Sequence, residues 1–200
     1  MALYSFSNPR SGSPYLSAMN CVLTPEAAIY CSSELTSGLR QYKEMQKHGV
    51  KSAVDLKRKR GEDWVQKNIV DVNIQEADLF AASVRHAQSD GTQVINPAPL
   101  KVPDWGQPEY LAFWEELIRS RVKEVRFNKN WQFSNGCTFE FVVATDAKVR
   151  TLDADGNLLG PRTAVEQMEA AIERFRDLDT KKLKEHLKQV QLLASRASTN

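Results

Sequence analysis

Residues 27–38 read AAIYCSSELTSG, and this stretch decides the class of fold. The apolar run at 27–31 has the length of a buried strand, and a loop of small residues follows it. A helical pattern then runs from Leu39 to about His48 and ends at Gly49. A strand, a small-residue loop and a helix in this order are typical of the opening unit of a doubly wound α/β domain.

The rest of the chain continues the same alternation. Further strands are expected at 92–96 and 124–127, with a strand pair at 148–159 around a turn at Asp155-Gly156. Helical patterns cover 39–48, 62–88, 109–123 and 163–195, the last with a break near 177–179, and a further helix passes through 141–144. Strands alternating with helices predict a mainly parallel sheet of the flavodoxin or Rossmann type, covered by helices on both faces.

The domain organisation expected from the sequence is simple. Residues 1–25 contain several prolines and show no periodicity, which indicates an extended or poorly ordered N-terminal arm. Residues 26–178 form one α/β domain. Residues 179–200 form a C-terminal helix whose apolar positions could pack on the domain or on a second subunit.

Composition excludes several classes of function. Among 200 residues, 27 basic and 25 acidic side chains leave a net charge of +2, which gives no overall field for nucleic acid or an anionic membrane. The basic run at 57–60 is interpreted as a solvated helix start or loop. No apolar run approaches the ~20 residues of a membrane helix. Cys21, Cys31 and Cys137 are too few and too widely spaced for a disulfide framework or a zinc site, and no signal pattern opens the chain. We therefore expect a cytoplasmic protein without a metal.

The stretch most informative about function is residues 130–144, NWQFSNGCTFEFVVA. It places Glu140 in a helix that follows a strand and a glycine-containing loop, where open α/β sheets bind ligands. Ser134 and the amides of 135–138 would face the same crevice near the positive end of the helix, which suits a phosphate. Gly136 would let the backbone approach a ligand closely. The pattern fits a structural role equally: Glu140 as a first-turn residue favoured by the helix dipole, and Ser134 as a helix cap.

Three segments together resemble the nucleoside 2-deoxyribosyltransferase-like proteins. Residues 29–38 look like the first strand and glycine/serine loop of that family, and residues 73–97 are similar to its second helix and strand. Trp131-x-x-Ser134-x-Gly136-x-x-x-Glu140 resembles its signature loop and catalytic glutamate. The likeness covers about 27–146 in the correct order. It is closest in pattern to the 2′-deoxynucleoside 5′-phosphate N-hydrolases and the CMP N-glycosidases.

The resemblance implies a nucleotide N-glycosidase with Glu140 as its nucleophile. Glu116 falls on a helix aspartate that the hydrolases use near the scissile bond, so its implied role is to protonate or orient the leaving base. The first loop departs from the family, because Glu34 stands in a segment that is richer in glycine in the hydrolases. The residues expected to form a 5′-phosphate cradle are Ser134, Asn135, Gly136, Ser33, Ser37 and Gly38. Two aromatic residues, Tyr30 and Trp105, are candidates to flank the base.

The chemistry itself requires carboxyl groups and no cofactor. Cleavage of a C1′–N bond builds positive charge on the sugar, which a carboxylate beneath C1′ stabilises and can capture as an ester. Three alternatives remain open from the sequence: a base-exchanging transferase, an N-glycosidase acting on NAD, and a catalytically silent nucleotide-binding module. The resemblance also implies a homodimer or higher homo-oligomer. The histidines, at 48, 86 and 186, are expected to face solvent.

Overall fold

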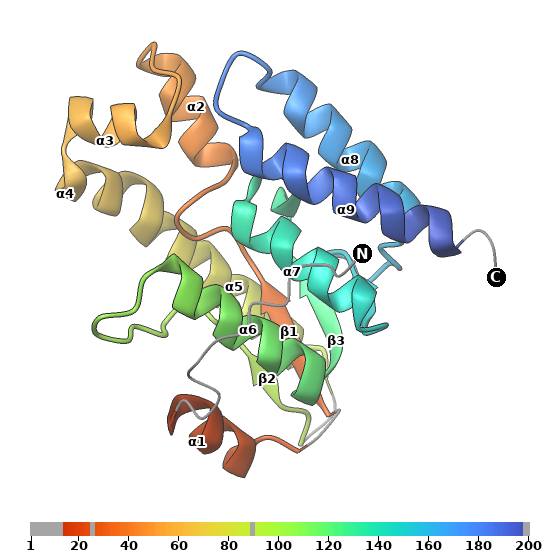
Figure 1. Ribbon diagram of the computed structural model, residues 1–200. Coiled ribbons are helices and arrows are strands. Elements are labelled where there is room, and N and C mark those ends of the chain that lie inside the picture. The colour runs from red at the N-terminus through yellow and green to blue at the C-terminus, as the bar shows by residue number, and fades with distance from the viewer. Residues whose placement is uncertain (1–13, 25–26, 89–90, 198–200) are drawn as a thin grey trace.

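The computed structural model describes residues 14–24, 27–88 and 91–197, which form a parallel sheet covered by helices (Figure 1). The sheet order is β2-β1-β3-β4, and every neighbouring pair is parallel. The strands are β1 (Ala28–Ser32), β2 (Val94–Ile95), β3 (Val122–Phe127) and β4 (Arg150–Leu152). This confirms the doubly wound α/β class. The expected strand pair around 155–156 is reduced to β4 and one antiparallel bridge between Leu152 and Leu158.

The order of the strands creates a switch point between β1 and β3. From β1 the chain proceeds to β2 on one side, and it then crosses to β3 on the other side. The connections after β1 and β3 therefore leave the sheet in opposite directions, and the carboxyl ends of such strands are where open α/β sheets bind ligands. The ends remain joined, since the amide of Asn128 donates to the carbonyl of Ser32 at 2.9 Å.

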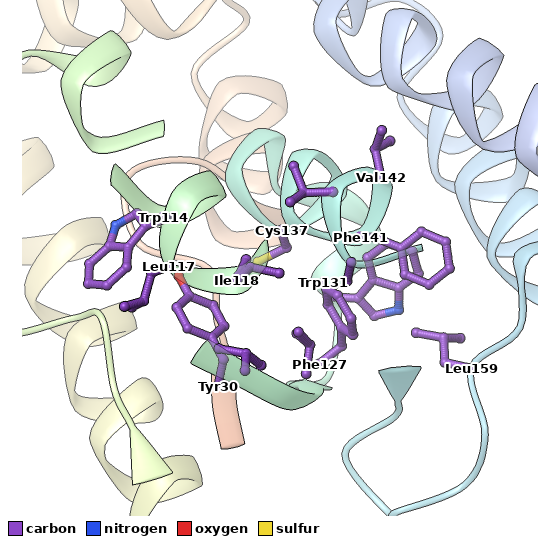
Figure 2. Close-up of a cluster of buried hydrophobic side chains, with 14 of the residues drawn as sticks. Tyr30, Trp114, Leu117, Ile118, Phe127, Trp131, Cys137, Phe141, Val142 and Leu159 are labelled. Atoms are coloured by element: carbon purple, nitrogen blue, oxygen red, sulfur yellow. The ribbon is translucent and has the colours of Figure 1, made fainter. Parts of the chain in front are cut away.

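Side chains alternate along β1 and meet helices on both faces. Ile29 and Cys31 pack against Phe80 and its neighbours on α5 (Asp71–His86). Tyr30 points to the opposite face, which α6 (Gln107–Arg121) and α7 (Asn135–Asp146) cover. Figure 2 shows Tyr30 beside Leu117 of α6. The alternation explains why every residue of β1 is buried.

An aromatic group anchors α7 on the sheet (Figure 2). The rings of Phe127, Trp131 and Phe141 lie with their centroids 5.0–5.5 Å apart. The indole nitrogen of Trp131 donates to Gln167 of α8 (Pro161–Arg174) at 2.9 Å. Full burial of each such ring contributes roughly 1.5–3 kcal/mol, so the helix that follows β3 is held firmly in position.

A second group of helices follows the loop after β1. It comprises α2 (Leu39–Lys47), α3 (Ala53–Arg60), α4 (Glu62–Val65) and a π-helical segment (Gln66–Val70) that leads into α5. The helical pattern expected over 62–88 is thus present, with a π turn inside it. The basic run 57–60 is exposed and lies in the last turn of α3, not at a helix start, where its charges complement the helix dipole.

The two ends of the chain differ from the expectations in one respect. Pro14–Val22 forms helix α1, so this part of the expected arm is not extended, while residues 1–13 lie outside the described chain. Helix α9 (Lys181–Ala197) lies alongside α8 and next to α7 (Figure 1). Its Leu183, Val190 and Leu193 are buried within the same chain. Across the described residues, none of the helices combines the length and apolar character needed to cross a membrane.

Candidate functional site

Glu140 lies at the switch point, on the helix that follows β3. A short 3-10 turn (Trp131–Phe133) leads to Ser134, which caps α7 by accepting a hydrogen bond from the amide of Cys137 at 3.4 Å. Since α7 begins at Asn135, Glu140 belongs to its second turn and not its first. The helix dipole acts mainly within the first turn, so it does not explain a glutamate at this position.

The Glu140 carboxylate is buried and points to β1. Its Oε1 accepts a hydrogen bond from the Tyr30 hydroxyl at 2.7 Å, and its Oε2 accepts one from the Ser32 hydroxyl at 2.6 Å. The side chain is 7% exposed. Tyr30 and Ser32 are two residues apart on one strand and therefore project from the same face. Each carboxylate oxygen is thus fixed by its own donor.

Burial sets the acidity of this carboxyl group. It raises the pKa of Glu140 from 4.5 to about 7, while the hydrogen bonds from Ser32 and Tyr30 act in the opposite direction. Burial, followed by the neighbouring Glu140 charge, raises the pKa of Tyr30 well above its ordinary value. Tyr30 therefore keeps its proton at neutral pH and remains a donor, while Glu140 is divided between its neutral and charged forms.

The loop after β1 meets the start of α7 beside Glu140. The Ser37 hydroxyl accepts a hydrogen bond from the amide of Asn135 at 3.0 Å and lies 3.5 Å from the Ser134 hydroxyl. A Cβ added at Gly136 would have the Ser134 oxygen, 3.8 Å away, as its nearest neighbour. The structure therefore brings together Ser37, Ser134, Asn135 and Gly136. Two amides of the expected phosphate cradle are already occupied by serine hydroxyls, and a Cβ at position 136 would be in ordinary van der Waals contact with Ser134.

Two buried polar atoms in this region have no partner among the described residues. They are the Ser33 hydroxyl oxygen and the Asn135 side-chain oxygen. Such atoms are uncommon in folded proteins, because each one loses its hydrogen bonds to water on burial. Both belong to segments that follow β1 and β3. The ends of these two strands therefore retain hydrogen-bonding capacity that the chain itself does not use.

Gly38, the remaining cradle residue, stands next to a carboxyl group. It is the N-cap of α2, and the amide of the next residue, Leu39, donates to Glu34 Oε1 at 2.9 Å. Gly38 was expected to contribute to the phosphate cradle. The N-terminus of α2, which it caps, binds an acidic side chain of its own loop.

Glu116 does not join Glu140. It is exposed on the outer face of α6, whereas the next two residues, Leu117 and Ile118, are buried against the sheet. The expected role of Glu116 at the leaving base is therefore corrected, because helical geometry turns it away from the sheet and from Glu140. Glu124 is buried but forms ion pairs with Arg126 at 2.6 Å and Arg150 at 3.4 Å, which indicates a structural role.

Of the two aromatic candidates, Tyr30 belongs to the core and Trp105 is partly buried against it. Tyr30 is completely buried, and its ring contacts Trp114 with centroids 5.6 Å apart. Trp105 packs against Phe113 with centroids 5.4 Å apart and also contacts Tyr15 and Tyr110. The ring of Tyr30 is not free to stack on a base, so the expectation that it flanks one is corrected, whereas for Trp105 the expectation stays a prediction. The functional contribution of Tyr30 is its hydroxyl group.

Sequence reasoning missed Ser32 and Cys137. The sequence pattern could have identified Ser32. Residues 30 and 32 carry hydroxyl groups on the same face of a fully buried strand, and such groups must find hydrogen-bond partners inside the protein. The Cys137 thiol lies between the hydroxyls of Ser32 and Ser134, and burial followed by the charge of Glu140 raises its pKa. This thiol stays protonated at neutral pH and is no nucleophile.

The histidines were only partly predicted. His86 is exposed, as expected. His48 is half-buried beside Glu44 and Trp64. His186 of α9 lies with Nδ1 2.8 Å from the hydroxyl of Thr138 in the first turn of α7, so its expected exposure is wrong. Burial lowers the pKa of His186 to about 4, and the ring is neutral at pH 7.

Within the described ranges, no three histidine, cysteine, aspartate or glutamate side chains gather in a way that could hold a metal ion. No protein-family profile, curated protein or solved structure matches the chain. The resemblance to nucleoside 2-deoxyribosyltransferase-like proteins therefore rests on the sequence motifs alone.

Proposed function

We propose that this protein is an N-glycosidase that hydrolyses the bond between a base and C1′ of its sugar, with Glu140 as the nucleophile. One observation carries the proposal: a buried carboxylate at the switch point of a parallel sheet, with a hydroxyl donor fixed to each oxygen. Open α/β sheets bind their ligands at this point. The resemblance of residues 27–146 to nucleoside 2-deoxyribosyltransferase-like proteins supports the same chemistry.

The reaction has two steps. In the first, a Glu140 oxygen bonds to C1′ as the C1′–N bond breaks, and the leaving nitrogen takes the electron pair of that bond together with a proton from solvent. In the second, water bonds to C1′, the ester bond to Glu140 breaks, and one proton returns to solvent. One water molecule is consumed, and a free base and a free sugar are formed.

Tyr30 and Ser32 act as positioning residues for this nucleophile. Their hydrogen bonds hold the carboxylate in one orientation and favour its charged form against the effect of burial. With a pKa of about 7, roughly half of the protein carries the charged nucleophile at neutral pH. In a buried site that charge acts more strongly on the positive charge developing at C1′ than it would in water.

The test is base release from a panel of substrates. We propose incubation with nucleosides, their 5′-monophosphates and NAD, with free base measured by chromatography. Glu140→Gln keeps the size of the side chain and removes the nucleophile, so base release should fall by at least about a thousandfold. Glu116→Gln is the matched control, because it removes a carboxylate that is exposed on α6.

Three further results bear on the proposal. Exchange of a labelled acceptor base would assign a transferase, in which a second base captures the ester. If the reaction is stopped with acid and the peptide that contains residue 140 has gained the mass of a sugar, this mass would support the ester directly. Undiminished base release by Glu140→Gln would remove Glu140 from its role as nucleophile, and binding of nucleotides without any release would remove the enzymatic function.

We also propose a homo-oligomer, which the resemblance implies. Leu183, Val190 and Leu193 of α9 are buried within the same chain, whereas Leu192 of this helix is exposed. Sedimentation velocity tests this directly, and a monomer at micromolar concentration would contradict it.

A further inference from the structure

The positive charge of the chain is concentrated in one short segment. Residues 47–60 contain six of the 27 lysines and arginines and only one of the 25 acidic residues. The rest of the chain therefore carries more acidic than basic side chains, and the small net charge of the whole molecule hides a local excess of cations. Such an excess attracts a polyanion at short range even where the overall field is weak.

This segment forms a helical projection at the edge of the molecule. Helix α3 follows α2 through a short turn in which Gly49 has φ +62°, a conformation that favours glycine. Figure 1 shows α3 at the outer side of the helical group, apart from the sheet. Of the eight residues of α3, all of them described, Leu56 alone is buried. Most of the surface of this helix therefore meets solvent.

The cations of α3 border a hollow in the surface. Residues 57–60 are all basic and all exposed. Arg58 and Lys59 line a hollow of about 470 Å³ together with Lys51, which belongs to the turn before the helix. The other lining residues are Gly49, Val50 and Asp55. Three cations from two segments thus surround one concave surface that contains a single carboxylate.

The charged groups have partners that a phosphate can replace. Arg58 contacts Asp55 at 3.0 Å, and the side chains of this pair are 75% and 42% exposed. Lys57 forms an ion pair with Glu62, again between exposed side chains. The amino group of Lys59 donates to a backbone carbonyl at 2.7 Å. Exposed ion pairs stabilise a protein little, so exchanging them for contacts to a ligand phosphate costs little.

The form of this surface distinguishes among polyanions. The major groove of B-form DNA admits an α-helix, whereas the major groove of double-stranded RNA is too narrow for side chains to reach into. A membrane would require an apolar outer face in addition to the cations, and four of the six exposed residues of α3 are charged. A projecting, cationic helix therefore fits a DNA duplex best.

We infer that the surface formed by residues 47–60, which we call the α3 surface, binds double-stranded DNA through its phosphates. Helix α3 approaches the major groove, and Lys51, Arg58 and Lys59 contact phosphates at the edge of the groove. Phosphate contacts carry no sequence information, so the binding does not depend on the base sequence. It involves none of the residues around Glu140 and is independent of the proposed glycosidase function.

The experiment measures the affinity of the full chain for a fluorescein-labelled DNA duplex of about 20 base pairs, by fluorescence anisotropy between about 50 and 200 mM NaCl. Three phosphate contacts predict that log K falls with log [salt] at a slope of about −2.7, which weakens binding roughly 40-fold over this range. The double variant Arg58→Gln/Lys59→Gln should reduce the slope to about −0.9. The matched control, Lys123→Gln/Lys129→Gln, removes two exposed cations elsewhere and should leave the slope near −2.7.

Two further variants separate charge from fold and from catalysis. Arg58→Lys keeps the charge and should bind DNA within about twofold of the wild type, whereas a loss as large as that of the double variant would contradict phosphate binding. Glu140→Gln should also bind DNA as the wild type does, so failure of the glycosidase function leaves this test unaffected.

Four outcomes would overturn the inference. They are no binding at about 50 mM NaCl, an equal change of slope in the α3 variant and its control, equal binding of an RNA duplex of the same sequence, and tighter binding of polyglutamate than of DNA. The last of these would assign an acidic protein partner to the α3 surface.

Discussion

Removal of the Tyr30 hydroxyl is the sharpest test of how the Glu140 carboxylate is held. Tyr30→Phe deletes the 2.7 Å hydrogen bond to Oε1 and leaves the buried ring in place. A hydrogen bond to a charged group contributes about 1.5–3 kcal/mol, which corresponds to about one to two pKa units. Since the pKa of Glu140 is already raised to about 7, the variant should titrate near ~8–9.

The assay is the pH dependence of kcat/KM for base release between pH 5.5 and 9.5. At pH 7 the charged fraction of Glu140 should fall from about one half to between a tenth and a hundredth, so activity should drop roughly 5- to 50-fold. Much of it should return at pH 9.5. Tyr42→Phe is the matched control, because its buried hydroxyl donates instead to the Asp179 carbonyl at 3.3 Å. The reasoning would be refuted if kcat/KM of Tyr30→Phe fell by the same factor at every pH, or if its pH profile still rose near pH 7.

Three more predictions concern single side chains. Glu140→Gln should be more stable than the wild type by about 3 kcal/mol at pH 9 and equally stable near pH 4.5. The raised pKa of Glu140 means that the folded wild type is stabilised by holding a proton there, and this stabilisation is lost as pH rises through about 7. Urea unfolding at the two pH values checks this, and a pH-independent difference would contradict it. Ser134→Ala should lower the free energy of unfolding by about 1 kcal/mol through loss of the α7 cap, measured by the urea midpoint, and an unchanged midpoint would deny that the cap contributes. Thr138→Val should change the pKa of His186 by less than about one unit, because burial, followed by the charge of Lys182, lowers this pKa. NMR titration of the ring measures it, and a larger change would contradict this reasoning.

The sequence was sufficient for the fold because its signals were local. The apolar run of β1, the loop after it and the helical periods each depend on residues close together, and the parallel sheet follows from their order. The glycine-free stretch from residue 62 was recognisable as helix, but its π turn was not, because that turn leaves no hydrophobic period of its own.

The site was only partly predictable because its contacts join distant segments. The loop motif located Glu140 and Ser134 at the crevice, since both follow β3 directly. Glu116 was placed by counting along the chain, which takes no account of the direction in which a helix turns its side chains. The contact between His186 and Thr138 depends on α9 folding back against α7, and no local pattern carries that information.

The hydroxyls that hold Glu140 come from residues 110 and 108 positions earlier in the chain. During synthesis, β1 therefore leaves the ribosome before the segment that carries the carboxylate, and the two hydrogen bonds require α7 to be in place against β1. Contacts between segments so far apart in sequence are slow to form, because a long loop must close first. A chain that ends before α7 would contain both hydroxyls and lack the group that they bind.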